Sequence, residues 1–289
     1  MQVIDIHTHG IGGYDTRAVS PDDILRIAEI QGSHGVSEII LAIYPSSVKT
    51  MRQNMETARK AIQLQKERKE TATQEAKIIG LYLEGPFLNP ARCGSLDAGI
   101  FIAPSYHGFK ELIEGYEDIT KIIAVAPEMK DATVLIKKLS DRGMIVTMGH
   151  SDATFAEAEA GFQAGARGIT HIFNAMRGFH HREPGIAGFG LLNQDIYIEV
   201  IADPYHLHTK TLELIFRAKN PERIIVVSDA VRGAGTSSGR QGITNNAGRL
   251  AGGCMTIAES SKRLVEMGFD RDFIMGCVTR NPERYLAGK

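Results

Sequence analysis

Eight short apolar runs, rich in Ile and Val, constrain the fold of this chain more than any other feature of its sequence. Each run ends in polar residues or in Gly or Pro, and each is nearly continuous rather than strictly alternating. Strands that are buried on both faces, as in parallel sheets, have this pattern. The eight predicted strands cover residues 3–6, 38–43, 78–83, 122–126, 144–148, 168–172, 196–201 and 224–227.

Segments with helical spacing separate these runs. Ser20 followed by Pro21 is typical of an N-cap with proline at the first helical position. A second helix carries apolar residues on one face at Met51, Met55, Ala58 and Ile62. Two further stripes of apolar residues at helical spacing follow Asp131 and Thr209. Eight strands that alternate with helices over 289 residues predict an α/β fold, a (β/α)8 TIM barrel.

Two other segments carry weaker patterns. Residues 66–77 are charged and low in apolar side chains, so we expect a frayed helix end and a loop there. Residues 272–286 have the spacing of a helix close to the C-terminus.

Composition excludes several classes of protein. Lys and Arg total 33 against 34 Asp and Glu, so the net charge of −1 argues against nucleic-acid binding through bulk positive charge. The apolar runs are too short to cross a bilayer, and the N-terminal residues do not have the pattern of a secretory signal. The three cysteines, Cys93, Cys254 and Cys277, are widely spaced without a CxxC motif, which indicates a reducing cytoplasm.

The C-terminal ends of the predicted strands carry metal-binding residue types. Catalytic residues of TIM-barrel enzymes lie at these ends. Because residues i and i+2 of a strand share a face, Asp5, His7 and His9 should point together into the barrel mouth. Later strands end with matching residues, and imidazole and carboxylate groups suit Zn²⁺ and similar divalent ions. The sequence therefore predicts a divalent metal site formed by His7, His9, Glu84, His150, His171 and Asp229.

The remaining candidates have less specific interpretations. His34 follows Ser33 at a predicted helix end, which indicates a cap or a surface residue. His107 and His208 are expected to be structural, while His180 and His181 lie in a loop and could be either structural or functional. Asp5 either supports a metal ligand or accepts hydrogen bonds from the backbone.

Nine motifs give the chain a family resemblance. They occur in family order across nearly the whole sequence, and EGPFLNP, FNAM and REPG are specific to the family rather than to metal-dependent barrels in general. The chain resembles the N-acetylglucosamine-6-phosphate deacetylases of the amidohydrolase superfamily. The motifs are IDIHTHG at 4–10, GLYLEGPFLNP at 80–90, APE at 126–128, GHSDAT at 149–154, THIFNAM at 170–176, HREPG at 181–185, IADPYHLH at 201–208, VSDA at 227–230 and LAGGCMT at 250–256.

The resemblance implies roles for individual metal ligands. Glu84, His150 and His171 match the family's main metal site. His7 and His9 match the pair that holds a second ion in members with two metals, so we expect one or two ions, with zinc as the metal. Asp229 matches the catalytic aspartate, which acts as general base and then as general acid in metal-assisted amide hydrolysis.

The resemblance also implies a substrate and an assembly. The substrate expected from it is an amino-sugar phosphate, with no nucleic acid or membrane as partner. Asn174 and Ala175 match positions whose backbone groups help to hold the sugar phosphate. Arg182 and His206 match phosphate contacts that reach across a dimer interface in the family, which implies a homodimer.

Three departures from the family pattern affect these expectations. Leu96 stands where a histidine that hydrogen-bonds the substrate is expected, and His107 could replace it only if its loop folds back. Pro204 stands where the family has a glycine, which should change the shape of the pocket. Family members also carry a small β-sandwich, which we expect to be missing, leaving residues 1–289 as a single catalytic barrel domain.

Other functions remain open at this point. An amidohydrolase acting on an unphosphorylated N-acyl sugar or a cyclic amide is the most serious alternative, because of Leu96 and Pro204. TatD-like metal-dependent nucleases share the barrel and its ligand types, although the near-neutral charge and the FNAM and REPG motifs argue against them. A non-catalytic sugar-phosphate sensor would have little use for Asp229.

Overall fold

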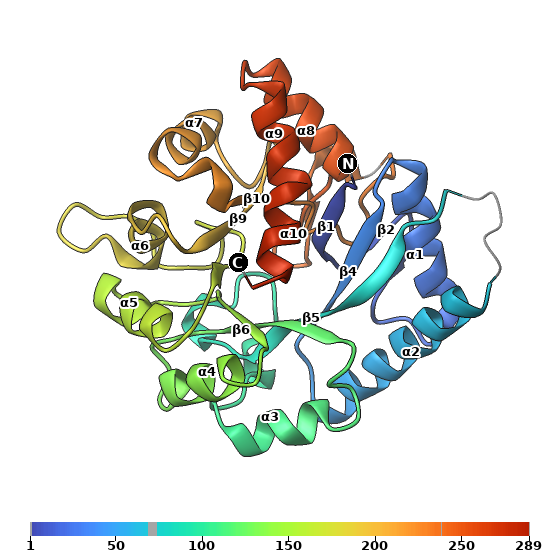
Figure 1. The fold of residues 1–289 in the computed structure, drawn as a ribbon, viewed down its shortest axis with the longest axis horizontal. Coiled ribbons are helices and arrows are strands. Elements are labelled where there is room, and N and C mark those ends of the chain that lie inside the picture. Colours follow the sequence, from blue (N-terminus) through green and yellow to red (C-terminus); the bar gives the residue numbers. More distant parts are fainter. Residues whose placement is uncertain (1, 69–73, 238, 289) are drawn as a thin grey trace.

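The computed structural model describes residues 2–68, 74–237 and 239–288. At its centre lies a sheet of eight parallel strands in the order β1-β4-β5-β6-β7-β8-β9-β10 (Figure 1). A bridge between Thr8 and Ala230 brings the two edge strands together, so the barrel is nearly closed. The strands are β1 (Ile4–Thr8), β4 (Glu38–Ile43), β5 (Lys77–Phe87), β6 (Thr120–Val125), β7 (Ile145–Met148), β8 (Gly168–Ile169), β9 (Tyr197–Ile201) and β10 (Ile224–Val227).

All eight predicted strands are confirmed, and two of them differ in length from the prediction by three residues or more. Strand β5 continues to Phe87, so it carries Glu84 within the strand rather than after it. Strand β8 stops at Ile169 because the chain turns at His171, whose φ of 28° is incompatible with an extended strand. Both differences lie at the end of the barrel where the predicted ligands gather.

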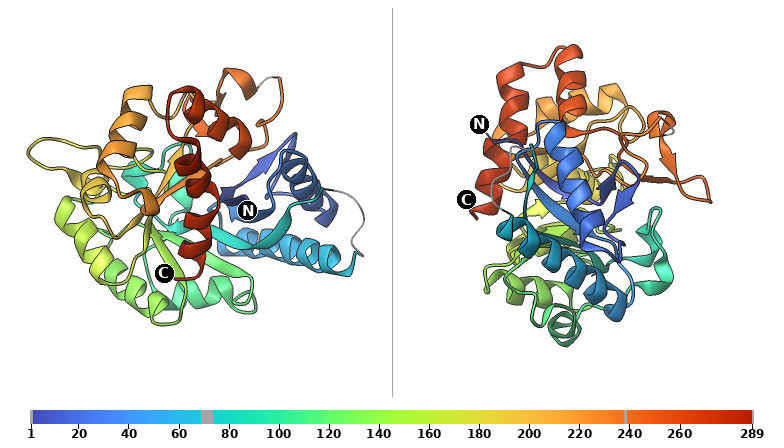
Figure 2. Two further views of the ribbon diagram at one scale, coloured as in Figure 1. Left: turned by 45° about the horizontal axis from the view of Figure 1, so that its top comes forward. Right: turned by 90° about the vertical axis from the view of Figure 1, so that its right-hand side faces the viewer.

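The helices surround the strands, as Figures 1 and 2 show. They are α1 (Pro21–Ser33), α2 (Val48–Glu67), α3 (Tyr106–Ile113), α4 (Ala132–Ser140), α5 (Phe155–Gln163), α6 (Gly185–Leu192), α7 (Thr209–Ala218), α8 (Ile257–Glu266), α9 (Arg271–Val278) and α10 (Arg280–Leu286). Short 3-10 turns lie at Pro90–Arg92, Ala98–Ile100, Pro221–Arg223 and Gly239–Gln241. Among the described residues, each helix is too short or too polar to span a bilayer.

Local signals explain where several helices begin. Ser20 accepts a hydrogen bond from the backbone N–H of Asp22, and Pro21 occupies the first helical position, as predicted. Capping boxes start α5 at Thr154 and α8 at Thr256. Each such cap satisfies backbone N–H groups that the first turn of a helix would otherwise leave unpaired.

The segment after Asp131 agrees with the prediction, and the segment at 272–286 differs from it. Asp131 precedes α4 as expected, but its backbone has a φ of 65° and its side chain makes no capping hydrogen bond. The predicted helix at 272–286 is interrupted at Thr279, where φ −127° and ψ −79° leave the helical region, so the segment forms α9 and α10. The charged segment at 66–77 lies partly outside the described residues, and its described part ends α2 and begins β5.

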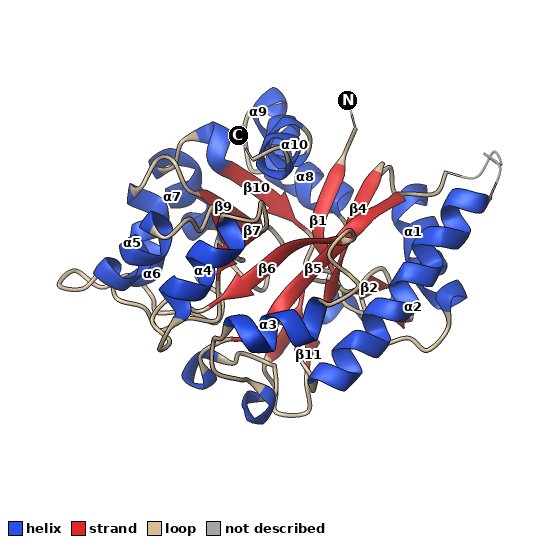
Figure 3. Ribbon diagram, turned by 60° about the horizontal axis from the view of Figure 1, so that its bottom comes forward, coloured by secondary structure: helices blue, strands red, loops and turns tan. Residues whose placement is uncertain are grey.

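Two small hairpins extend the strand ends. Strands β2 (Gly10–Ile11) and β3 (Tyr14–Asp15) follow β1, and strands β11 (Ile243–Thr244) and β12 (Leu250–Gly252) follow β10. Figure 3 shows the helices on the outside and the strands inside, with β11 below the barrel in that view. Since parallel strands all point the same way, their C-terminal ends form one face of the barrel.

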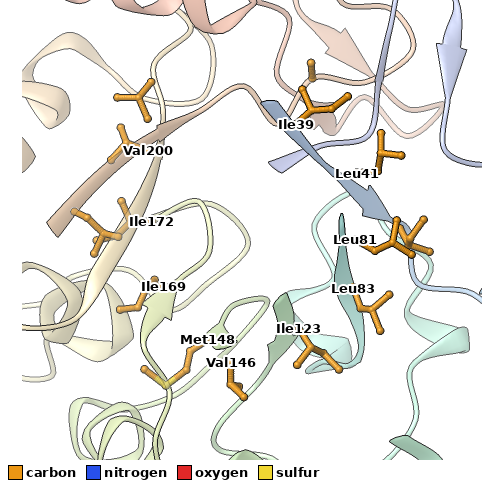
Figure 4. Packing of buried hydrophobic residues seen from close by; sticks show 14 of the residues in the cluster. Ile39, Leu41, Leu81, Leu83, Ile123, Val146, Met148, Ile169, Ile172 and Val200 are labelled. Atoms are coloured by element: carbon orange, nitrogen blue, oxygen red, sulfur yellow. The ribbon is translucent and has the colours of Figure 1, made fainter. Parts of the chain in front are cut away.

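The core has two layers separated by the strands. Alternate strand positions face opposite sides, so Ile39 and Leu41 of β4 pack with the helices, whereas Ile40 and Ala42 belong to a second cluster inside the barrel. Figure 4 shows part of the outer layer, where labelled side chains such as Leu41, Leu83 and Val146 belong to one cluster of buried residues. This double burial explains why the strands have nearly continuous apolar sequences.

Met55→Ala tests the outer layer. Met55 is fully buried in the predicted α2 stripe, so its truncation should lower the free energy of unfolding by about 2–5 kcal/mol. Leu64→Ala on the same helix is the matched control, because Leu64 is 40% exposed and should cost less than about 0.5 kcal/mol. Urea unfolding of both variants provides the measurement, and equal losses would show that the burial assignment is wrong.

Candidate active site

The predicted metal ligands converge at the C-terminal end of the barrel in two groups of three. Ligand atoms of Glu84, His150 and His171 lie within 4.8 Å of one another, and those of His7, His9 and Asp229 do the same. All six residues are buried. The structure therefore brings together every metal ligand that the sequence predicted.

Glu84 lies between the two groups. Its Oε1 is 3.2 Å from Nε2 of His150 and 3.1 Å from Nε2 of His171. Its Oε2 is 3.2 Å from Nε2 of His9, and Oε1 is 3.8 Å from Nε2 of His7. One carboxylate thus faces four imidazoles contributed by three different strand ends.

Asp229 completes the second group from the end of β10. Its Oδ1 is 3.5 Å from Nε2 of His7 and 3.5 Å from Nε2 of His9. Its backbone N–H donates to the carbonyl of His7 at 2.9 Å, which fixes the loop after β10 against β1. The carboxylate also lines the pocket described below, so it can reach a molecule bound there.

Backbone conformation directs three of these side chains. His150, His171 and Asp229 have φ values of 47°, 28° and 45°, in the left-handed region that costs a residue other than glycine on the order of 1–3 kcal/mol. Each lies directly after a strand, where the turn aims its side chain across the barrel mouth. Strain of this kind concentrates at functional sites.

The electrostatics of the cluster favour positive charge. Burial alone would raise the pKa of Glu84, but the hydrogen-bonded imidazoles, first that of His150, hold it well below its usual range. Burial would lower the pKa of His7, yet the carboxylates of Glu199 and Asp229 raise it to about 10. The carboxylates therefore dominate the local field, which suits a divalent cation.

Orphaned imidazole nitrogens test whether the cluster fits a metal. Nδ1 of His7 is hydrogen-bonded to Oε2 of Glu199 at 2.9 Å, while the buried Nε2 of His7 has no hydrogen-bond partner among the described residues. His150 bonds the carbonyl of Arg92 through Nδ1, which leaves Nε2 directed at Glu84. Metal-binding histidines are typically held in this way by their outer nitrogen. The donor set therefore fits a divalent metal of the zinc type.

Glu199 is a site residue that the sequence reasoning missed. It lies on β9, is 2% exposed, and contacts the outer nitrogen of His7. A carboxylate inside a strand run that is otherwise apolar was the signal that could have identified it. Its partner could not be assigned, because His7 and Glu199 lie 192 positions apart.

The sequence left open whether Asp5 supports a metal ligand or accepts hydrogen bonds from the backbone, and the structure shows the second. Its carboxylate accepts hydrogen bonds from the backbone N–H groups of His7 and Ser228 and from the hydroxyl of Ser228. It thereby ties β1 to β10 directly beneath the ligand cluster.

A pocket of about 250 Å³ opens above the cluster. Its floor is formed by predicted ligands, including His9 and Glu84, and its walls include residues that the sequence did not single out. Tyr44 stacks on His9 with 3.9 Å between ring centroids, and Arg249 lies on the hairpin side. The complete lining is His9, Tyr44, Glu84, Gly94, Ser95, Leu96, His150, His171, Asn174, Ala175, His206, Asp229, Arg249, Leu250, Ala251 and Gly252.

The predicted substrate-binding residues separate into two groups. Asn174, Ala175 and His206 line the pocket. Arg182 is exposed on the loop before α6, where it donates to His181, and it does not line this pocket. Its predicted role depends on a second chain and stays a prediction.

The departures from the family pattern can also be located. Leu96 lines the pocket, as a residue at its expected position should. His107 is exposed on α3 and does not line the pocket, so it does not replace the missing histidine. His34 and His208 are helix caps, which confirms their structural interpretation.

A buried ion pair holds His206 at the pocket. Nδ1 of His206 lies 2.9 Å from Oδ2 of Asp203, and Oδ1 of Asp203 accepts hydrogen bonds from the backbone N–H groups of Tyr205 and His206. Burial raises the pKa of Asp203, but His206 and these N–H groups outweigh it and lower the pKa to about 2. Burial lowers the pKa of His206, and Asp203 outweighs it, so the net shift is upward.

Asp203→Asn tests this pair through the pH dependence of stability. The lowered pKa of Asp203 means that its contribution is present above pH 3.8 and is lost as the pH falls through about 2. The raised pKa of His206 means that its contribution is complete below pH 6.5 and is lost as the pH rises through the folded value. We expect Asp203→Asn to cost about 2 kcal/mol near pH 5, with a smaller cost at both extremes, in urea unfolding. A cost that is independent of pH would contradict the ion pair.

The chain is similar in sequence to known deacetylases. No family model matches the chain. The N-acetylgalactosamine-6-phosphate deacetylase of Escherichia coli O157:H7 is 31% identical over 276 residues, which cover 91% of this chain and 71% of that protein. The N-acetylglucosamine-6-phosphate deacetylase of Bacillus subtilis (strain 168) is 31% identical over 277 residues, covering 91% of this chain and 69% of that protein.

Structural comparison gives the same type of enzyme. The crystal structure of the N-acetyl-D-glucosamine-6-phosphate deacetylase from Mycobacterium smegmatis is similar, with a TM-score of 0.86 and 26% sequence identity. The similarity covers 99% of this chain and 78% of that one. Sequence and fold therefore point to one family of barrel enzymes.

Proposed function

The chain belongs to the N-acetylglucosamine-6-phosphate deacetylase family, and we propose that it removes the acetyl group from an N-acetyl amino-sugar phosphate by metal-dependent hydrolysis of the amide. The observation that carries this proposal is the pocket in which two groups of metal ligands form the floor and Asn174, Ala175 and His206 line the walls. Amide hydrolysis breaks a carbon–nitrogen bond, as the family's deacetylation requires.

The two ligand groups would hold the metal that activates water for attack on the amide. Glu84, His150 and His171 would hold one ion, and His7 and His9 with Asp229 would hold a second. A divalent metal held there would supply hydroxide at neutral pH, because coordination lowers the pKa of water from 15.7 to about 7. We propose zinc as the metal, because mixed imidazole and carboxylate donors suit it.

Asp229 is proposed to transfer a proton from the water to the leaving amine. Its carboxylate faces the pocket, accepts a proton from the attacking water as general base, and then donates that proton to the amine nitrogen as general acid. An amine leaves poorly unless it is protonated, so this delivery decides whether the tetrahedral intermediate collapses to acetate and free amino sugar. The wall residues meanwhile hold the sugar in one orientation.

Backbone geometry at the FNAM turn suits the substrate's phosphate. Phe173 and Ala175 have φ values of 74° and 48°, and the N–H groups of Phe173 and Asn174 are engaged within this turn, by Sδ of Met176 and the carbonyl of His171. The N–H of Ala175 has no acceptor within the described part of the chain, and Ala175 lines the pocket. This supports the proposed role of Asn174 and Ala175 in holding the phosphate.

Arg182 is proposed to reach the phosphate of a neighbouring copy in a homodimer, where His206 also contributes to phosphate binding. Arg182→Ala should then raise the KM for a phosphorylated substrate and leave an unphosphorylated one unchanged, because a guanidinium binds phosphate by paired hydrogen bonds. Arg217→Ala, on the exposed face of α7, is the control. If both substrates respond alike, the phosphate assignment is wrong, and sedimentation of the wild type checks the dimer.

One alternative function has an observation in its favour. Leu96 gives the pocket wall an apolar side chain where the family pattern has a histidine, so an unphosphorylated N-acyl sugar or a cyclic amide remains a second candidate. A metal-dependent nuclease has no comparable support, because the net charge of the chain is −1. We also propose that the protein works in the cytoplasm, in keeping with its three free cysteines.

Acetate release tests the proposed function directly. Protein of known metal content is incubated with N-acetylglucosamine, N-acetylgalactosamine and the 6-phosphate of each, and in a separate reaction with labelled single-stranded DNA. We expect acetate from the 6-phosphates, little from the unphosphorylated sugars, and intact DNA. Equal release with and without phosphate would favour the alternative amidohydrolase, and DNA cleavage without acetate release would overturn the proposal.

A further inference from the structure

The hairpin of β11 and β12 carries a positive charge to the mouth of the pocket. Arg249 precedes β12 and lines the pocket. The turn before it is held by the side chain of Asn245, whose Oδ1 accepts the N–H groups of Ala247 at 2.9 Å and Arg249 at 3.1 Å. The guanidinium therefore stands on an ordered turn rather than on a loose loop end.

The hairpin is attached to the loop that follows β5. Nη1 of Arg249 donates to the carbonyl of Gly94 at 2.9 Å, and Nδ2 of Asn245 donates to the carbonyl of Ser95 at 3.2 Å. At its other end, Gly242 packs against the ring of Tyr205, next to His206. The hairpin thus connects the two loops that border the pocket.

Gly94 places the guanidinium close to the FNAM turn. A Cβ added to Gly94 would lie 3.1 Å from Cβ of Ala175 and 3.6 Å from Cε1 of His150. Gly94 therefore lies close to the segment proposed above to hold the phosphate, with little room for a side chain between them, while its carbonyl accepts the hydrogen bond from Arg249. Arg249, Ala175 and His206 line the same small cavity.

We infer that Arg249 is a specificity-determining residue that binds the anionic phosphate group of the substrate from within the same chain. This inference rests on the proposed function and deepens it. A guanidinium has five N–H donors, and the contacts of Arg249 with the carbonyl of Gly94 and with Sγ of Cys93 both use Nη1, so the donors on Nε and Nη2 remain for phosphate oxygens. Arg249 gives the pocket a positive charge from the same chain. This charge is present whether or not Arg182 of a second chain reaches the pocket.

A purely structural role for Arg249, as a latch between the hairpin and the loop, is the competing explanation. Asn245→Ala shows the effect of loosening the hairpin without removing charge, because it removes the hydrogen bond to Ser95 and the acceptor of the turn that carries Arg249. Arg249→Lys retains the charge and loses the paired geometry of the guanidinium. Comparison of these variants with Arg249→Gln isolates the effect of charge on an anionic ligand.

The experiment measures KM and kcat for N-acetylglucosamine 6-phosphate, kcat/KM for N-acetylglucosamine, and inhibition by inorganic phosphate. Arg249→Gln should raise the KM for the 6-phosphate and the inhibition constant of phosphate at least ~10-fold, with kcat and the unphosphorylated sugar little changed. Arg249→Lys should recover part of the loss. Asn245→Ala should change the values for both sugars by the same small factor.

Two results would overturn the inference. One is an unchanged inhibition constant of phosphate in Arg249→Gln, and the other is an Arg249→Gln variant that loses activity on both sugars by the same factor. Neither affects the proposed function, because the wild type would still release acetate. Failure of the proposed function is recognised separately, as a wild type that releases no acetate from either sugar.

Discussion

Asp229→Asn should cut turnover at least ~100-fold while leaving the protein able to bind metal at Glu84, His150 and His171. The amide keeps the size of the carboxylate and one oxygen that can still face His7 and His9, both 3.5 Å from Oδ1 in the native protein. It cannot accept the proton of the attacking water or return it to the amine. Losses of ~10²- to 10⁴-fold are usual when a general acid–base group is removed.

Acetate release and metal analysis of the same preparation provide the measurement. Asp152→Asn is the matched control, since Asp152 is a carboxylate at the same end of the barrel that pairs with Arg92 and Arg177 outside the pocket. The control should turn over at a rate close to that of the wild type. Normal turnover in Asp229→Asn would remove this residue from the mechanism.

Glu84→Gln should have an effect at least as large and of a different kind, because it should remove metal as well as activity. The two oxygens of Glu84 reach His150 and His171 on one side and His9 on the other. A neutral amide in their place withdraws the negative charge that offsets a buried cation. We expect metal affinity to fall by more than the ~10- to 100-fold that is typical of changing a residue that only orients a ligand.

Metal per chain after dialysis against a weak chelator is the measurement for Glu84→Gln, with circular dichroism to confirm folding. Glu259→Gln, which changes a carboxylate in the capping box of α8, is the control and should retain its metal. The two substitutions in the cluster are separable, since Asp229→Asn should bind metal without turnover and Glu84→Gln should do neither. Full metal content in Glu84→Gln would contradict the assignment of this carboxylate as a ligand.

Local patterns predicted the barrel because the physical causes of its elements are local. The run at 38–43 is apolar at consecutive positions since Ile39 and Ile40 face opposite layers of the core, and the structure has a strand there. Ser20 and Pro21 mark the start of α1 by a capping hydrogen bond that spans two residues. The interruption at Thr279 was missed although Pro282 marks it, because a proline has no N–H to donate to the carbonyl of residue 278 and is tolerated in the first turn of a new helix.

The metal cluster was also predictable, for a topological reason. Once eight parallel strands form a barrel, the residues after each strand must meet at one face, whatever their separation in sequence. His7 and Asp229 are 3.5 Å apart in the structure for this reason. Because side chains alternate along a strand, the sequence alone predicted that His7 and His9 lie on the same side of β1.

Residues on the walls of the pocket could not be predicted in the same way. Arg249 reaches the pocket only because the hairpin after β10 folds toward Gly94, 155 positions earlier in the chain. Tyr44 follows a strand whose end carries no ligand, so its stacking on His9 had no sequence signal. Positions that depend on loop conformation require the structure.

Titration of metal-free protein with Zn²⁺ tests the central claim most directly. Protein stripped with a chelator is supplied with increasing equivalents of zinc, and acetate release from N-acetylglucosamine 6-phosphate is measured at each point. Activity should be absent at the start, rise in proportion to added zinc, and reach a plateau at one or two ions per chain. Full acetate release by the stripped protein, with no response to added metal, would contradict hydrolysis at this cluster.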